Sequence, residues 1–108
     1  MDNKPGTLYI VATPIGNLND ITNRAIEILN KVDICAAEDT RKSIKLFNAL
    51  NINTNLTSYH KFSEKSKTTS LIKKLLSGQD VAIISDAGTP LISDPGRHLV
   101  NGAIEEGI

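Results

Sequence analysis

Short apolar runs alternate along the chain with longer segments whose apolar residues recur at helical spacing. The runs cover residues 8–12, 32–37 and 81–85, and a weaker one covers residues 55–59. Runs of this length are typical of buried strands, whereas the segments between them have the period of helices that cover a sheet. Strands that alternate with helices favour a parallel sheet. The sequence therefore predicts an α/β fold with a mainly parallel sheet and flanking helices.

Start and stop signals predict four helices. The expected starts, in chain order, are Asn19 or Asp20, Thr40 as the cap of the second helix, Ser63, and Asp94-Pro95. Gly78 and Gly107 are the expected stops of the third and fourth helices, because glycine readily adopts the left-handed conformation that ends a helix. The residues expected to face the core, helix by helix, are Ile21, Ala25, Ile28, Leu29 and Val32; Ile44, Phe47 and Leu50; Leu71, Ile72, Leu75 and Leu76; and Leu99, Val100, Ala103 and Ile104.

Composition limits the kind of protein this can be. The 108 residues are 40% hydrophobic, enough for one domain with a core and too few for two. Twelve basic and twelve acidic residues cancel, so any RNA partner must be bound by local patches. The single cysteine, Cys35, lies in an apolar run and is expected to be a buried thiol in a reducing compartment. No apolar segment predicts a membrane span or a signal peptide and no metal site is indicated, so we expect a cytoplasmic protein.

Two loops at predicted strand ends have the residues of a ligand site. Residues 13–20 follow the first strand, and residues 85–96 follow the last and lead into a helix that begins at Asp94-Pro95. Ligands of open α/β sheets bind at this edge, where Gly88 would let a ligand approach the backbone. Taken singly, each loop is better explained as an ordinary strand-to-helix turn, which uses the same residues for backbone reasons alone.

Four motifs occur in a particular order along the chain. They are Thr13-Pro14-Ile15-Gly16-Asn17-Leu18 with Asp20-Ile21-Thr22, then Glu38-Asp39-Thr40-Arg41, then Ser58-Tyr59-His60, and then Ser85-Asp86-Ala87-Gly88-Thr89-Pro90 through Asp94-Pro95-Gly96. In this order and approximate spacing, the chain from Leu8 to its end resembles the N-terminal domain of the ribosomal RNA small subunit methyltransferase I family, within the tetrapyrrole methylase superfamily. Four motifs in register are far more specific than any one of them.

The resemblance implies a cofactor, S-adenosyl-L-methionine, held largely by backbone groups at strand ends. It assigns to the cofactor Pro14, at the end of the first strand, and Ala87, Gly88, Thr89 and Ile92, in the long loop. The glycine patterns of dinucleotide-binding folds and P-loops are absent, which argues against those two classes.

The resemblance also implies an activity and a larger protein. The activity is methylation of the 2′-hydroxyl of a cytidine ribose in small-subunit ribosomal RNA, with that RNA or the assembled subunit as partner. In the family a second domain follows, and the cofactor lies between the two. We therefore expect residues 1–108 to be the N-terminal methylase domain of a homodimeric protein, without its C-terminal domain and inactive alone. Ile108 is expected to begin a further strand.

Glu38 and Arg41 are the candidate catalytic residues. Methyl transfer to a hydroxyl requires removal of a proton from the oxygen. A start-of-helix role explains Asp39 well and Glu38 less well, while Arg41 is expected either to hold a phosphate or to pair with Asp39. The general base stays open among the polar residues at predicted strand ends, which are Glu38, Asp39, Arg41, His60, Asp86 and Asp94.

Basic and aromatic residues flank these loops. The basic ones are Arg41, Lys42, Lys45, Lys61, Lys65 and Lys67. They are expected to form either a rim that faces RNA phosphates or the solvated faces of helices. Tyr59 and Phe62 could stack on a base, although packing beneath the third helix is the favoured role of Phe62.

Two other functions are compatible with the sequence. One keeps the superfamily and changes the acceptor to a carbon of a tetrapyrrole, either precorrin or uroporphyrinogen; the Glu38-Asp39-Thr40-Arg41 motif and Thr89 favour RNA instead. The other is a non-catalytic domain for RNA binding or dimerisation. Lys61-Phe62-Ser63-Glu64 departs from the family pattern, which has a second histidine and an asparagine there, so no role is carried over to this loop.

Overall fold

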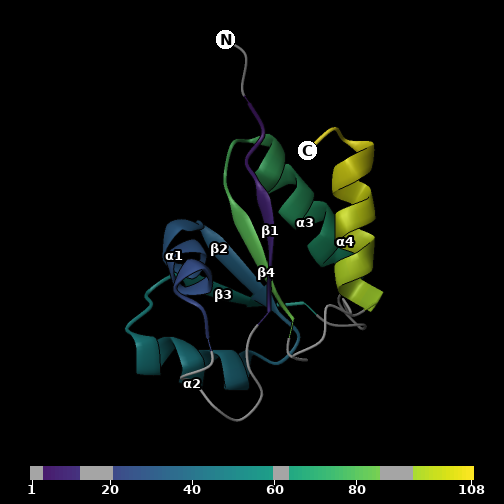
Figure 1. Ribbon diagram of the computed structural model, residues 1–108. Coiled ribbons are helices and arrows are strands. Elements are labelled where there is room, and N and C mark those ends of the chain that lie inside the picture. The colour runs from purple at the N-terminus through teal and green to yellow at the C-terminus, as the bar shows by residue number, and fades with distance from the viewer. Residues whose placement is uncertain (1–3, 13–20, 60–63, 86–93) are drawn as a thin grey trace.

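The computed structural model describes residues 4–12, 21–59, 64–85 and 94–108 (Figure 1). Strands and helices alternate strictly along the chain. They are β1 (Leu8–Ala12), α1 (Asn23–Lys31), β2 (Ile34–Ala37), α2 (Thr40–Leu50), β3 (Asn55–Ser58), α3 (Glu64–Leu76), β4 (Val81–Ser85) and α4 (Asp94–Glu105).

The four strands form one parallel sheet in the order β1-β4-β2-β3. β4 lies between β1 and β2, and its residues Val81, Ala82, Ile83 and Ile84 are all at most 5% exposed. A strand buried on both faces is expected to be apolar throughout, as β4 is. The α/β fold with a parallel sheet is thereby confirmed.

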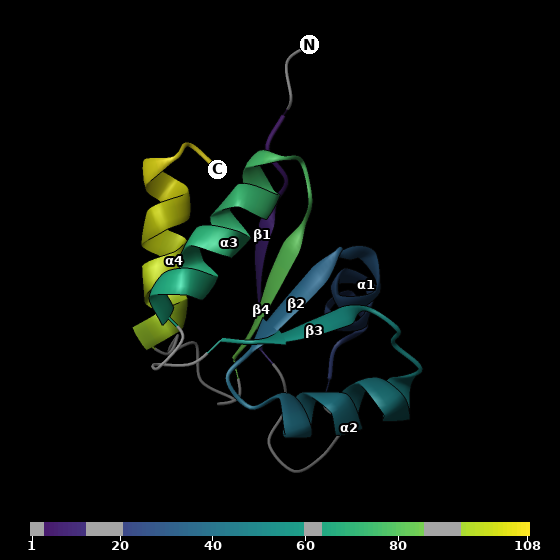
Figure 2. The same cartoon turned by 180° about the vertical axis from the view of Figure 1, so that it is seen from behind.

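Helices cover both faces of the sheet (Figures 1 and 2). Leu29 of α1 and Phe47 of α2 pack in a cluster on one face, together with Cys35 of β2. Leu71 of α3 and Leu99 of α4 pack in a second cluster on the other face. Burial raises the pKa of the Cys35 thiol to about 12, as expected for an inert cysteine in the core.

Two helix starts differ from the prediction. α1 begins at Asn23, not near Asn19 or Asp20, because the Thr22 hydroxyl accepts a hydrogen bond from the backbone N–H of Ala25 at 3.0 Å and so caps the helix. α2 is capped by Asp39, one residue earlier than predicted, and Thr40 is its first helical residue. The predicted start of α3 at Ser63 lies outside the described residues.

Three residues predicted to face the core are instead exposed. Ile44 is 48% exposed, Leu76 40% and Ile104 67%. In α2 the buried side is the narrower set Ser43, Leu46 and Phe47, which excludes Ile44. Ile104 lies on α4, which packs beside α3 and is flanked on its other side by no described element (Figure 1). The predicted stops are confirmed, since Gly78 and Gly107 both have positive φ.

The amino ends of the strands are tied together by a small polar network. The Asp80 carboxylate accepts the backbone N–H of Thr7 at 2.8 Å, and the Asp33 carboxylate accepts the N–H of Asp80 at 2.8 Å. Gly6 lies against the same turn, where its N–H donates to the carbonyl of Leu75 at 2.7 Å. A Cβ at Gly6 would lie 1.8 Å from the carbonyl oxygen of Gln79, so only glycine fits.

Gly6→Ala is therefore expected to destabilise the protein by about 1–3 kcal/mol, since backbone must shift to admit the methyl group. The matched control is Gly102→Ala in α4, where the added Cβ would meet Ile72 at an ordinary 3.5 Å and alanine favours the helix. Thermal unfolding should show a lower Tm for Gly6→Ala and an unchanged or higher one for Gly102→Ala. Equal stability of Gly6→Ala and wild type would contradict the close approach to Gln79.

Candidate functional site

The carboxyl ends of the four strands meet at one edge of the sheet. β1 ends at Ala12 opposite Ser85 of β4, and β2 ends at Ala37 opposite Ser58 of β3. All four end residues are small, so little side-chain volume separates the terminal backbone groups from a molecule placed at this edge. The strand ends are the part of a parallel sheet where ligands bind.

The connections from β1 and β4 diverge at this edge. β1 leads along the chain to α1 on one face of the sheet, whereas β4 leads to α4 on the other (Figures 1 and 2). In open α/β sheets such divergence forms the crevice where a ligand binds, and the two predicted cofactor loops follow Ala12 and Ser85 along the chain. The predicted cofactor residues themselves lie outside the described residues and stay predictions; they are Pro14, Ala87, Gly88, Thr89 and Ile92.

The turn after β2 brings the candidate catalytic residues to the same edge. Asp39 caps α2 and accepts the backbone N–H of Arg41 at 3.0 Å, and the Arg41 guanidinium lies 3.6 Å from the same carboxylate. Because Asp39 satisfies the helix start, Glu38 is left exposed, and no described residue pairs with its carboxylate. Glu38 is thus the carboxylate of this turn that is open to a ligand.

Arg41 pairs with Asp39, one of the two roles that the sequence left open, and its role toward a phosphate stays a prediction. Its side chain contacts Asp39 and is still 91% exposed, so the guanidinium retains donors that point to solvent. An arginine whose position is set by a neighbouring carboxylate is suited to hold a phosphate.

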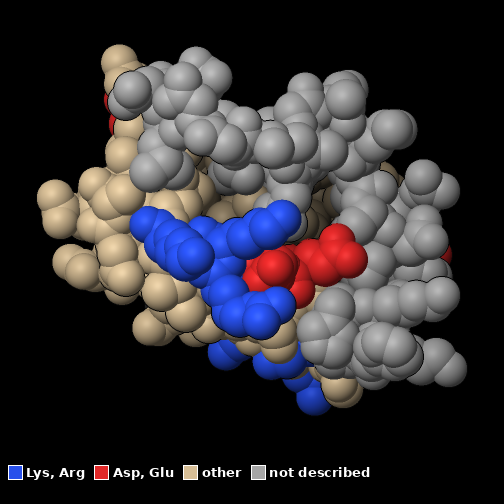
Figure 3. Space-filling model, turned by 90° about the horizontal axis from the view of Figure 1, so that it is seen from below, with Lys and Arg blue, Asp and Glu red and all other residues tan. Residues whose placement is uncertain are grey.

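Further basic residues adjoin this turn on α2. Lys42 and Lys45 are exposed, as is Arg41. Figure 3 views the molecule from below, from the side where the strands end, and shows lysine and arginine side chains gathered beside an acidic group. Exposed basic side chains on α2 fit both the rim that faces phosphates and the solvated helix face, so the choice between them stays open, and Lys61 and the side chain of Lys65 lie outside the described residues.

Tyr59 and Lys67 do not have the roles considered for them. Tyr59 is 2% exposed in the cluster beneath α3, and its hydroxyl shares a hydrogen bond with Thr68, so it cannot stack on an RNA base. Lys67 donates to the hydroxyl of Thr57 at 2.7 Å and so ties α3 to β3. His60 and Phe62 lie outside the described residues.

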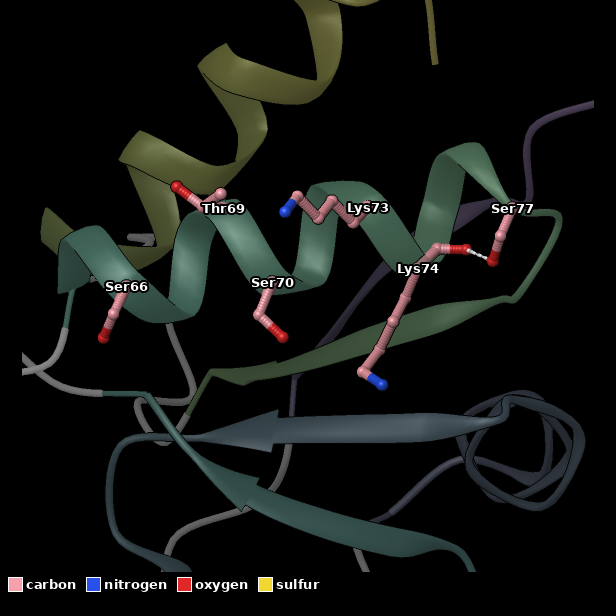
Figure 4. Close-up of a pocket in the computed structure, with 6 residues that line it drawn as sticks. All are labelled: Ser66, Thr69, Ser70, Lys73, Lys74 and Ser77. Atoms are coloured by element: carbon pink, nitrogen blue, oxygen red, sulfur yellow. Dashed lines mark hydrogen bonds between the residues drawn. The ribbon is translucent and has the colours of Figure 1, made fainter.

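One polar feature was missed in the sequence. An open groove of about 450 Å³ follows the outer side of α3 (Figure 4). Its lining residues are Ser66, Thr69, Ser70, Lys73, Lys74 and Ser77. The signal was available, because hydroxyl and lysine side chains recur at helical spacing opposite the apolar stripe of α3.

In the described part of the chain, no group of three or more histidine, cysteine, aspartate or glutamate side chains lies close enough together to hold a metal ion. None of its helices has the length and apolar character needed to cross a membrane.

The Asp39 cap gives a pH-dependent prediction. Partial burial acts to raise the pKa of this carboxyl, but the N–H groups of Arg41 and Lys42, together with the charges of both side chains, outweigh it and hold the pKa below its ordinary value of 3.8. A lowered pKa in the folded state stabilises the protein above pH 3.8, and this contribution disappears as the pH falls through the folded-state value.

Asp39→Asn keeps a capping side chain and removes the charge. Its Tm should lie below that of wild type at pH 7, and the two should converge below about pH 4. Glu27→Gln, at an exposed carboxylate of α1, is the control and should show a smaller difference at pH 7. A difference between Asp39→Asn and wild type that persists at pH 2 would contradict the charge-based account of the cap.

Three kinds of comparison with known proteins indicate the family of this chain. The model of the family Tetrapyrrole (Corrin/Porphyrin) Methylases matches residues 7–108. Ribosomal RNA small subunit methyltransferase I of Escherichia coli O157:H7 is 54% identical over 107 residues, which cover 99% of this chain and 37% of the relative. The protein of the same name from Mycoplasmopsis pulmonis is 56% identical over 101 residues, which cover 94% of this chain and 46% of the relative. The chain thus spans less than half the length of these two relatives.

Among solved structures, uroporphyrin-III-C-methyltransferase from Thermus thermophilus superposes with a TM-score of 0.71 over 95% of this chain and 44% of its own. At 19% identity this likeness shows the fold alone. The family match covers nearly all of the chain, and the fold agrees with it. The chain therefore belongs to the tetrapyrrole methylase family.

Proposed function

We propose that this chain is the N-terminal domain of an S-adenosyl-L-methionine-dependent methyltransferase that methylates the ribose 2′-hydroxyl of a cytidine in small-subunit ribosomal RNA. The observation that carries the proposal is the Glu38–Arg41 turn at the carboxyl edge of the sheet, where an exposed carboxylate that pairs with no described residue lies beside an exposed guanidinium. Relatives named ribosomal RNA small subunit methyltransferase I, 54–56% identical to the chain, support the RNA acceptor.

The cofactor fits the described part of this edge. Small residues end all four strands, and the connections from β1 and β4 lead to helices on opposite faces of the sheet, the divergence that in open α/β sheets forms the crevice where ligands bind. Pro14, Ala87, Gly88, Thr89 and Ile92 would hold the cofactor on both sides of this crevice. When bound, S-adenosyl-L-methionine supplies a methyl group activated by its sulfonium.

Glu38 and Arg41 divide the remaining work. Arg41 holds a phosphate of the RNA backbone near Asp39, which orients the guanidinium. Glu38 accepts a hydrogen bond from the ribose hydroxyl, and it either takes the proton or directs it to water. Positioning of the nucleotide by such contacts is a large part of the rate enhancement in a transfer between two bound molecules.

The active protein in this proposal is larger than the chain. The E. coli relative is longer, since the chain matches 37% of it, and an apolar groove of about 240 Å³ lies between the free edge of β1 and α4. Ile10 and Ile104 are exposed there, a surface that further protein would cover. We propose that a C-terminal domain completes the cofactor cleft, that the full-length protein is a homodimer in the cytoplasm, and that residues 1–108 alone are inactive.

The 108-residue chain is accordingly expected to bind S-adenosyl-L-methionine far more weakly than the full-length E. coli relative, because half of the cleft buries less of the ligand. Calorimetric titration of both proteins measures the difference. Circular dichroism of the chain serves as the control for folding. Equal affinities would show that this domain alone holds the cofactor.

Glu38→Gln and Arg41→Ala in the full-length protein should each reduce turnover on small ribosomal subunits at least tenfold, with cofactor affinity close to that of wild type. Lys31→Ala and Glu27→Gln on α1 are the matched controls, since each removes the same charge away from the turn. A lowered Tm with unchanged turnover would reduce Glu38 and Arg41 to helix-start residues.

The product identifies the acceptor. Nuclease digestion and mass spectrometry of subunits treated with the wild-type protein should reveal one 2′-O-methylcytidine. A tetrapyrrole methylated on carbon would indicate the alternative enzyme. Salt-dependent RNA binding without cofactor binding would indicate a non-catalytic RNA-binding domain.

A further inference from the structure

The groove on the outer side of α3 has a consistent chemical character. Figure 4 shows its six lining side chains along the helix, with Ser66, Ser70 and Lys74 on one side of the helix axis and Thr69 and Lys73 on the other. Every lining side chain is a hydroxyl or an ammonium group. The groove therefore has positive charge and hydroxyl groups, one of which, that of Ser77, donates to the carbonyl of Lys74 at 2.7 Å, and its lining has no acidic or aromatic group.

No described carboxylate forms an ion pair with the lysines of this groove. Between Glu64 and Asp80 the sequence has four lysines and no carboxylate. Two ion pairs occur among the described residues, and neither includes Lys73 or Lys74. Lys67, by contrast, is turned toward β3, where it donates to Thr57. Lys73 and Lys74 thus leave two ammonium charges for an external anion.

The groove starts near the edge of the sheet where the proposed RNA site lies. α3 follows β3, so its first turn lies near the carboxyl edge of the sheet and its last turn near the opposite edge (Figures 1 and 2). From Ser66 to Ser77 the groove extends about 16 Å at the helical rise per residue. It lies on the face of the sheet opposite α1. A polymer that occupies the carboxyl edge could continue along α3 for a few nucleotides.

We propose that this groove binds the sugar-phosphate backbone of the RNA that flanks the target nucleotide. Lys73 and Lys74 contact phosphates, and the Ser70 hydroxyl hydrogen-bonds to a phosphate or ribose oxygen. The lining has no aromatic ring to stack on a base, so binding here is independent of sequence. The inference rests on the proposed function, because it extends the RNA site from the Glu38–Arg41 turn onto the face covered by α3.

The test removes the two charges together, as Lys73→Gln with Lys74→Gln in the full-length protein. The probe is a single-stranded RNA oligonucleotide of mixed sequence, and its Kd is measured over a range of KCl concentrations without cofactor. Loss of two phosphate contacts should reduce the slope of log K against log salt by about 1.4 and weaken binding roughly tenfold near 0.1 M salt. Arg24→Gln with Lys31→Gln on α1 is the control, which removes the same charge from the opposite face and should leave the slope unchanged.

Three results would overturn the proposal. One is an unchanged salt slope in the Lys73 and Lys74 variant, and another is a wild-type protein that does not bind the oligonucleotide at low salt. The third is a Lys73 and Lys74 variant with a lowered Tm and unchanged RNA binding, which would show that another part of the full-length protein covers the groove. Because the assay needs no methyl transfer, RNA binding through this groove by a protein that methylates no RNA would refute the proposed function alone.

Discussion

The parallel pairing of β4 with β1 on one side and β2 on the other is the constraint on which this structure depends. β4 is the strand that both faces of the molecule bury, with side chains at most 5% exposed from Val81 to Ile84. Its alternate residues belong to the two core clusters, Ala82 and Ile84 to one and Val81 and Ile83 to the other. A change of one position in its register would exchange these sets, so the register is strongly specified.

This pairing also determines where chemistry can take place. Parallel strands share a carboxyl edge, so β1, β2, β3 and β4 bring Ala12, Ala37, Ser58 and Ser85 to the same side. At the opposite edge, Asp33 and Asp80 fix the turns with hydrogen bonds of 2.8 Å to backbone N–H groups. One edge is thus held by polar contacts within the chain, while the other presents Glu38 and Arg41 to solvent. The proposed RNA site at Lys73 and Lys74 depends on the same geometry, because α3 runs from the carboxyl edge of the sheet back toward the opposite edge.

Strand positions, the parallel sheet and the family could all be predicted from the sequence, because apolar runs of β length and motifs in a fixed order are signals along the chain itself. Helix caps and the buried sides of helices were predicted less reliably, because they depend on how neighbouring elements pack. Thr40 and Asp39 are both residue types that cap helices well, and which of them caps α2 depends on where β2 ends. Ile44 and Ile104 have helical spacing that suits a core, but α2 and α4 bury narrower sides than a central helix would.

In the candidate site, too, some features could be predicted from the sequence and others only from the structure. The sequence singled out Glu38 and Arg41, and the structure adds that Asp39 satisfies the helix start and leaves Glu38 open. Tyr59 beside basic residues suggested a stacking surface, yet its ring fills the core beneath α3 with Ala36 and Leu99, residues far from it in the sequence, so no local pattern reveals the contact. The groove at Lys73 and Lys74 likewise becomes evident only when α3 is seen in place on the sheet.

The central claim is that the cofactor binds at the carboxyl edge of the sheet beside β1 and β4. It is tested most directly by titrating S-adenosyl-L-methionine into the ¹⁵N-labelled full-length protein and following backbone amide resonances. The account predicts shifts at Ala12, Glu38 and Ser85, with Thr7, Asp33 and Asp80 unaffected. Shifts confined to Thr7, Asp33 and Asp80, or no response at the strand ends while the cofactor binds, would contradict it.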